Sequence, residues 1–179
     1  MTTNVNLKSV YAEDIFRLAK GPEDKVFYNS SAEHAVIVHQ ALVKYAKEYI
    51  YIFSSSMCTE ISNNPEYCQY MRDFLDLDGT HKIHIVLTDY NDAFKNMPIA
   101  KLLADYPMQV IVKQFNGKVM YNGQPAHFTV TDDRAFRLET NIKEHMAFGN
   151  FNSPDQAKVL RETFEQIFNS NLCKGVNLC

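Results

Sequence analysis

The sequence predicts an α/β fold with three layers, in which helices cover both faces of a mixed, mainly parallel sheet. Two observations favour this class. Through residue 113, short apolar runs alternate with amphipathic segments, which is the pattern of strands joined by crossover helices. The runs at 49–53 and 82–87 are almost continuously apolar, as strands buried between two layers are.

The predicted elements follow from spacing and from turn residues. Amphipathic periodicity predicts helices, and β-branched or aromatic runs predict strands. Helices are expected at 6–20, from a Ser30–Glu33 capping box to about 47, and at 65–76, 93–105 and 153–168. Strands are expected at 25–29, 49–53, 82–87 and 108–113. Two Asn-Gly turns then separate short antiparallel strands near 118–121, 126–131 and 134–139, with another at 145–150.

The chain of 179 residues has the length of one domain. We expect an N-terminal helical extension over 1–24, a core over 25–169 and a frayed tail over 170–179. The cysteines Cys58, Cys68, Cys173 and Cys179 form no CxxC pair. In the absence of a secretory signal pattern, they are interpreted as reduced thiols of a cytoplasmic protein.

Charge and motifs narrow the class of function. The formal net charge is −3, so the chain is not expected to gather nucleic acid by charge alone, although nucleic acid stays a possible partner. No apolar stretch is long enough to span a membrane. His81 and His84 would lie on opposite faces of a strand, and no nucleotide-binding or zinc motif is present, so neither a cofactor nor a metal is expected.

Three passages resemble the phospholipase D-like superfamily. The first runs from Phe27-Tyr-Asn-Ser-Ser-Ala-Glu to Ala46-Lys-Glu-Tyr-Ile-Tyr-Ile-Phe53. The second is Thr131-Asp-Asp-Arg-Ala-Phe-Arg-Leu-Glu-Thr140, and the third runs from 144 to 168. The likeness spans roughly 25–169 and implies one half of a phospholipase D-like domain. It also implies a homodimer, or a partner that replaces the second half.

The resemblance implies phosphodiester transfer without a metal, through a His-x-Lys-x4-Asp motif on one strand. Residues i and i+2 of a strand share a face, so the His can attack phosphorus while the Lys neutralises a phosphate oxygen. In this chain, Pro125 stands at the His position and His127 at the Lys position. Glu139 and Thr140 stand on the Gly-Ser of the family. Proline cannot act as a nucleophile, and the Glu139 carboxylate opposes phosphate binding, so we expect the usual reaction to be lost.

Several residues are candidates for a rebuilt or inherited site. His127, with Thr129 on the same face, is the candidate nucleophile or ligand, and the ordinary alternative is a hydrogen-bonded strand histidine. Glu139 and Glu144 could face each other across the cleft, or could pair with neighbouring basic residues. The remaining candidates are Thr140 and, for ligand binding, Ser54, Ser55, Ser56 and Asp133. The serines follow a central strand, where ligands of α/β proteins bind. His34 and His39 are expected to face solvent or to support packing.

The first functional hypothesis is a non-catalytic domain that binds a partner protein or a phosphate-bearing ligand, such as a nucleotide or nucleic acid, through the inherited cleft or dimer face. One alternative is a phosphodiesterase or endonuclease with a remodelled active site at His127. A second alternative is a bacterial or phage accessory or inhibitor protein.

Overall fold

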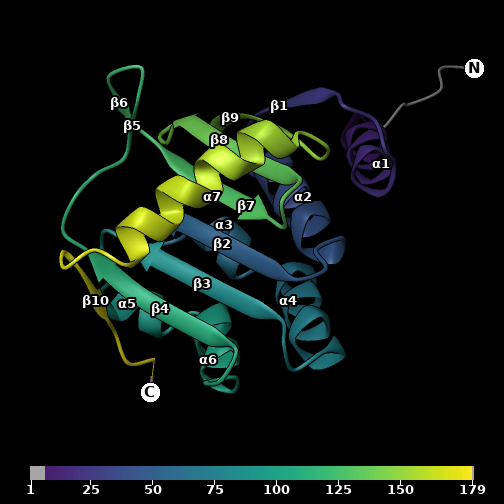
Figure 1. Ribbon diagram of the computed structural model, residues 1–179. Helices are drawn as coiled ribbons and strands as arrows, with labels where there is room; N and C mark the ends of the chain where they lie inside the picture. The colour runs from purple at the N-terminus through teal and green to yellow at the C-terminus, as the bar shows by residue number, and fades with distance from the viewer. Residues whose placement is uncertain (1–6, 179) are drawn as a thin grey trace, which may run out of the picture.

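The computed structural model describes residues 7–178, so Cys179 and residues 1–6 of the predicted extension lie outside the described part. An eight-stranded sheet forms the centre, with strand order β1-β9-β8-β7-β2-β3-β4-β10. Its strands are β1 (Val26–Ser30), β2 (Tyr49–Ser54), β3 (Lys82–Leu87), β4 (Val110–Phe115), β7 (His127–Thr131), β8 (Ala135–Asn141), β9 (Met146–Asn150) and β10 (Cys173–Gly175). The short strands β5 (Met120–Tyr121) and β6 (Gln124–Pro125) form a separate hairpin that projects beyond the sheet (Figure 1).

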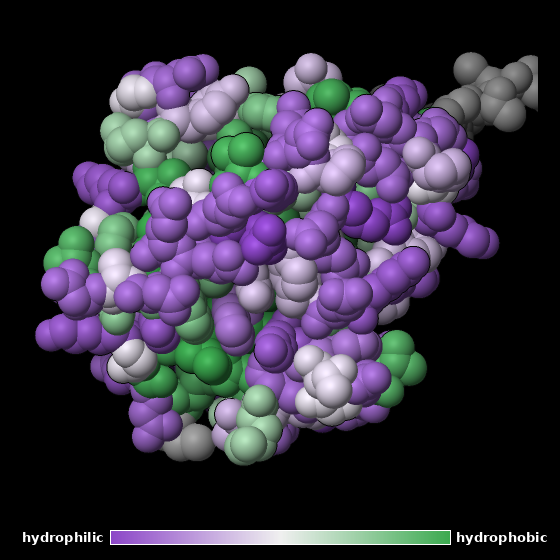
Figure 2. Space-filling model, viewed as in Figure 1, coloured by the Kyte–Doolittle hydropathy of each residue, from purple (hydrophilic) through white to green (hydrophobic). Residues whose placement is uncertain are grey.

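The helices lie on both sides of the sheet, and the predicted three-layer α/β class is confirmed. They are α1 (Leu7–Lys20), α2 (Ala32–Lys44), α3 (Thr59–Ser62), α4 (Pro65–Leu77), α5 (Asp92–Lys95), α6 (Pro98–Ala104) and α7 (Pro154–Phe168). Helix α7 alone crosses the near face in Figure 1, α2 to α6 lie behind the sheet, and α1 lies at its right-hand side, next to α2. The outer side of α7 is mostly hydrophilic (Figure 2), because its buried residues Ala157, Phe164 and Phe168 face the strands.

The sheet is mixed. Only β2, β3 and β4 pair in parallel, and every other neighbouring pair is antiparallel. Strands β1, β2, β3, β4 and β8 nevertheless run in one direction, while β7, β9 and β10 run in the other. The expected parallel sheet is therefore confined to the part in which strands alternate with helices, as the need for crossover connections requires.

The central strands are apolar on both faces because both faces are covered. On the α7 side, the Tyr51 ring stacks on Phe164 and His84, with centroid separations of 4.7 Å and 5.2 Å. On the other side, Ile50, Ile52, Ile83 and Ile85 are buried in the core formed with α4 and α6. This packing fixes β2 in the middle of the molecule and so fixes the loop that follows it.

Three element predictions need correction. The 93–105 helix is split into α5 and α6, because Pro98 keeps Met97 in an extended conformation, with φ −68° and ψ 146°. Helix α2 is capped by Ser31, whose side chain accepts from the His34 N–H, and not by Ser30. The frayed tail is wrong for 173–175, since β10 pairs with β4 and Cys173 is buried.

Candidate functional site

A cavity of about 280 Å³ opens at the carboxyl end of β2. The chain leaves this strand through Ser54, Ser55 and Ser56 and then turns sharply at Met57, whose φ is 60°. The loop is held to the next parallel strand, because the Thr88 and Asp89 N–H groups donate to the Ser54 and Ser55 carbonyls at 3.0 Å and 2.9 Å. All three serines line the cavity, as the position of a ligand-binding loop in an α/β sheet predicts.

A chain of charged and polar side chains forms the sheet side of the cavity. His127 on β7 and Glu139 on β8 are register partners, and His127 Nδ1 donates to Glu139 Oε2 at 3.1 Å. Arg137, on the same face of β8 as Glu139, donates from Nη2 to Oε1 at 2.9 Å. Its Nε donates to Asn29 Oδ1 on β1 at 3.0 Å. His145, before β9, brings Nδ1 to 3.6 Å from Glu139 Oε1.

Glu139 is ionised although it is only 6% exposed. Burial alone would raise the pKa of this carboxyl. The His127 hydrogen bond and the Arg137 charge outweigh burial and hold the pKa at about 2. Arg137 carries the one permanent positive charge among the described residues that line the cavity, and the chain's own carboxylate neutralises it.

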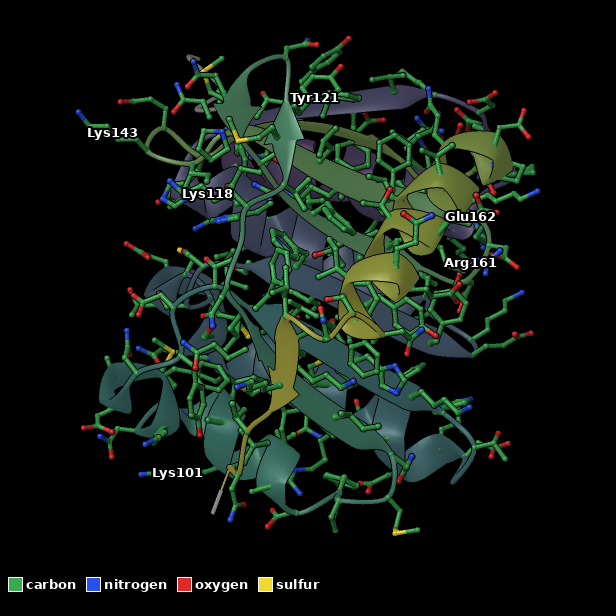
Figure 3. The ribbon with its side chains drawn as sticks, turned by 60° about the vertical axis from the view of Figure 1, so that its left-hand side comes forward. Lys101, Lys118, Tyr121, Lys143, Arg161 and Glu162 are labelled. Atoms are coloured by element: carbon green, nitrogen blue, oxygen red, sulfur yellow. The ribbon has the colours of Figure 1, made fainter. Side chains whose placement is uncertain are left out.

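Other basic side chains lie outside this cavity. Lys118, before the β5–β6 hairpin, and Lys143, in the β8–β9 turn, are exposed and point away from the ribbon (Figure 3). Within residues 7–178, no group of three or more His, Cys, Asp or Glu side chains is arranged to hold a metal ion. The cavity thus offers hydrogen-bonding groups, an internally neutralised ion pair and the exposed carboxylate of Glu60.

The family and the fold are established by comparison. Residues 31–174 match the model described as "Domain of unknown function (DUF7931)". The chain belongs to this family. No curated protein matches the chain.

Solved structures place this DUF7931 domain in the phospholipase D-like fold. NucT from Helicobacter pylori is 14% identical, with a TM-score of 0.58, and the match covers 86% of this chain and 99% of that one. The phospholipase D family member Nuc from Salmonella typhimurium is 12% identical, with a TM-score of 0.54, over 88% of this chain and 99% of that chain. The archaeal chromatin protein TrmBL2 is 11% identical, with a TM-score of 0.63, over 96% of this chain and 64% of that one.

The predicted site residues divide into two groups in this DUF7931 domain. His127, Glu139, Ser54, Ser55 and Ser56 line one cavity. Thr140 instead lines a separate hollow beside the β5–β6 hairpin, which Pro125 also lines. Glu144 is exposed in the β8–β9 turn, where its N–H donates to Asn141 Oδ1 at 3.2 Å. The expectation that Glu139 and Glu144 face each other across the cleft is therefore wrong.

Asp133 lies far from the cavity, at the opposite end of β2. Its carboxylate accepts from the Tyr49 hydroxyl at 3.0 Å and pairs with Arg161 of α7 at 2.7 Å. The neighbouring Asp132 accepts from the backbone N–H groups of Lys47, Glu48 and Tyr49. This Asp-Asp pair therefore joins β7 to the start of β2 and takes no part in the cavity.

Several cavity residues were not predicted as site residues. Arg137 is among the basic neighbours expected to pair with a carboxylate, and it pairs with Glu139. His145 is expected only as the first residue of a strand, and β9 begins after it, at Met146. His39 lines the cavity and is buried, so of the two expectations for its helix position, solvent exposure is wrong and a place in the packing holds. Its neighbours Ile37, Val38 and Gln40 are buried as well, and such an all-round buried helix leaves no amphipathic signal that separates a cavity residue from the core.

Proposed function

We propose that this chain is a non-catalytic phospholipase D-like domain that binds a small molecule in the cavity at the carboxyl end of β2. The proposal rests on one observation, which is that Glu139 and Arg137 already form an ion pair with each other in the cavity. The Glu139 carboxylate accepts from His127 Nδ1 and Arg137 Nη2, two donors that a phosphate would otherwise use, and it neutralises the Arg137 charge.

The reactive position supports the same conclusion. Alignment with the family motif puts Pro125 where the nucleophilic His stands. Pro125 is exposed and belongs to the β5–β6 hairpin, outside the cavity lining. The residue at the Lys position, His127, already donates its Nδ1 proton to a carboxylate. A phosphodiester entering the cavity would find the Arg137 charge already neutralised by Glu139 and no other Arg or Lys among the described lining residues, which disfavours a phosphate-bearing ligand.

One observation favours the alternative phosphodiesterase. A histidine oriented by a carboxylate through Nδ1 is the arrangement of a general base, and serine hydroxyls line the same cavity. Hydrolysis of bis-p-nitrophenyl phosphate and of plasmid DNA separates the two functions. The proposal expects no turnover above background from the wild-type protein. Turnover that His127→Ala abolishes and His81→Ala preserves would establish the alternative.

The homodimer stays a prediction of the resemblance. Light scattering after size-exclusion chromatography tests it, with twice the chain mass of 20.6 kDa as the expected result. Within the described part of the chain, no helix is both long and apolar enough to cross a bilayer.

A further inference from the structure

Three buried polar groups on the helical side of the cavity lack hydrogen-bond partners. His39 of α2, Ser62 of α3 and Tyr67 of α4 all line the cavity and are 8%, 0% and 0% exposed. Within residues 7–178, His39 Nδ1, Ser62 Oγ and Tyr67 Oη have no partner. Folded proteins pair nearly all such atoms, so three unpaired ones around a single cavity indicate that their partners come from outside the chain.

All three groups are uncharged at neutral pH. Burial, aided by the nearby Arg137 charge, lowers the pKa of His39 to about 3, and burial raises the pKa of Tyr67. The Arg137–Glu139 pair is the closest source of charge on the sheet side, and its members already neutralise each other. An anionic ligand group would find no free positive charge here, because the other carboxylate of the lining, Glu60, is negative as well, and burying an unpaired charge is costly. An uncharged, hydrogen-bonding group fits this chemistry.

The size of the cavity sets the scale of that ligand. Its volume of about 280 Å³ is several times the roughly 30 Å³ that a water molecule occupies in the liquid. The His39 and Tyr67 rings meet nearly edge to face, with centroids 6.1 Å apart, and Ile52 and Ile61 add apolar surface to the lining. Polar groups set among apolar faces are typical of sites for small organic molecules.

We propose that the wall formed by His39, Ser62 and Tyr67 binds a small uncharged polyhydroxyl compound, a free sugar or a polyol. This inference rests on the proposed function and names the ligand class of the same cavity. A ligand hydroxyl both donates and accepts, so it can satisfy a serine hydroxyl, a tyrosine hydroxyl or either tautomer of a neutral imidazole. The apolar ring and isoleucine faces would contact the carbon skeleton.

Melting temperatures in the presence of matched ligand pairs test the proposal. The probes are glucose, glycerol and myo-inositol, each compared with its monophosphate, added to the wild-type protein. We expect at least one uncharged probe to raise the melting temperature and its monophosphate to have no effect, because a ligand stabilises the state that binds it. Tyr67→Phe and Ser62→Ala should each abolish the shift. Tyr70→Phe, which removes a hydroxyl from the same helix outside the cavity, should preserve it.

A second readout concerns the protein without ligand. Tyr67→Phe deletes an unpaired buried hydroxyl, so we expect it to raise the melting temperature by about 2–4 °C. A decrease would show that the hydroxyl is already satisfied and would overturn the inference. Absence of a shift with every uncharged probe, or equal shifts with the monophosphates, would also overturn it. Monophosphate binding without phosphodiester turnover would leave the non-catalytic function intact, whereas turnover would contradict that function instead.

Discussion

His127 and Glu139 face each other across β7 and β8, with Nδ1 and Oε2 3.1 Å apart. The pair joins a histidine that lines the cavity to a carboxylate that is itself hydrogen-bonded to the buried Arg137. Neither partner can change without leaving the other, or Arg137, unsatisfied. The free energy of unfolding should therefore depend on the charges of these side chains, and it can be measured.

Replacing Glu139 by Gln should destabilise the protein by about 3 kcal/mol at pH 7, because it leaves the buried Arg137 charge uncompensated. Urea unfolding gives the free energy of unfolding. Glu144→Gln is the matched control, since this exposed side chain lies outside the cavity, and its effect should stay within about 0.5 kcal/mol. Equal effects of the two substitutions would show that the buried pair contributes no stability.

The acid limb of the stability curve should depend on Glu139. Its pKa in the folded protein, about 2, lies below the ordinary value of 4.5, so the unfolded chain binds the proton more readily. The stabilisation from this group is present above pH 4.5 and is lost as the pH falls toward 2. Unfolding measured from pH 5 to pH 2.5 should show a shallower loss in Glu139→Gln than in the wild type. Parallel curves would contradict the depressed pKa.

His39 should make the wild-type protein less stable as the pH falls below 6.5. Its pKa is about 3 in the fold and 6.5 ordinarily, so the unfolded chain takes up the proton first. Between pH 7 and pH 5 this uptake lowers the free energy of unfolding by about 2 kcal/mol. Substitution by Gln should remove that part of the slope. An unchanged slope in His39→Gln would show that the imidazole titrates normally in the fold.

Helix α7 should depend on Phe164 for its attachment to the sheet. This ring is fully buried and stacks on Tyr51 and Phe168, with centroids 4.7 Å and 5.5 Å away. Phe164→Ala should therefore destabilise the protein by about 3–5 kcal/mol in urea unfolding. Val159→Ala, on the exposed side of the same helix, should change stability by less than about 0.5 kcal/mol. A small effect of the Phe164 substitution would mean that α7 is held elsewhere.

Gly149 of β9 should not tolerate a side chain. A Cβ at this position would lie inside van der Waals contact of the Phe136 carbonyl oxygen and of the Phe27 ring. Gly149→Ala is expected to lower the melting temperature by several degrees, since overpacking costs about 1–3 kcal/mol. Gly79→Ala places its methyl in open space and serves as the control. Similar melting temperatures for both variants would contradict the close approach.

The fold was largely predictable because its signals are local. The alternation of apolar strands and amphipathic helices is visible through residue 113, and Asn122-Gly123 forms the turn of the β5–β6 hairpin. The strand β10 was missed because Cys173-Lys-Gly175 has little strand propensity. It pairs with β4, which is distant in the sequence, and the residues around it carry no local strand signal. Pro98 indicates a break between two helices, but the apolar periodicity on both sides of it favoured one continuous helix over 93–105.

The site was predictable in part, for a similar reason. The two-residue period of a strand predicts which neighbours share a face with His127. The position of the three serines at the end of β2 predicts that they line the cavity. The contributions of α2, α3 and α4 come from separate helices, whose meeting depends on tertiary packing. His39, Ser62 and Tyr67 share no motif, and their common feature, unpaired polar atoms around one cavity, exists only in the folded chain.

Titration of the protein with inorganic phosphate, followed by the NMR signals of the His127 imidazole, tests the central claim most directly. The account predicts that these signals stay unchanged at neutral pH, because Glu139 already neutralises the buried Arg137 charge and accepts the His127 Nδ1 hydrogen bond. A saturable shift of the His127 signals would contradict the account, because it would show that an anion binds at the His127 imidazole although Glu139 neutralises Arg137.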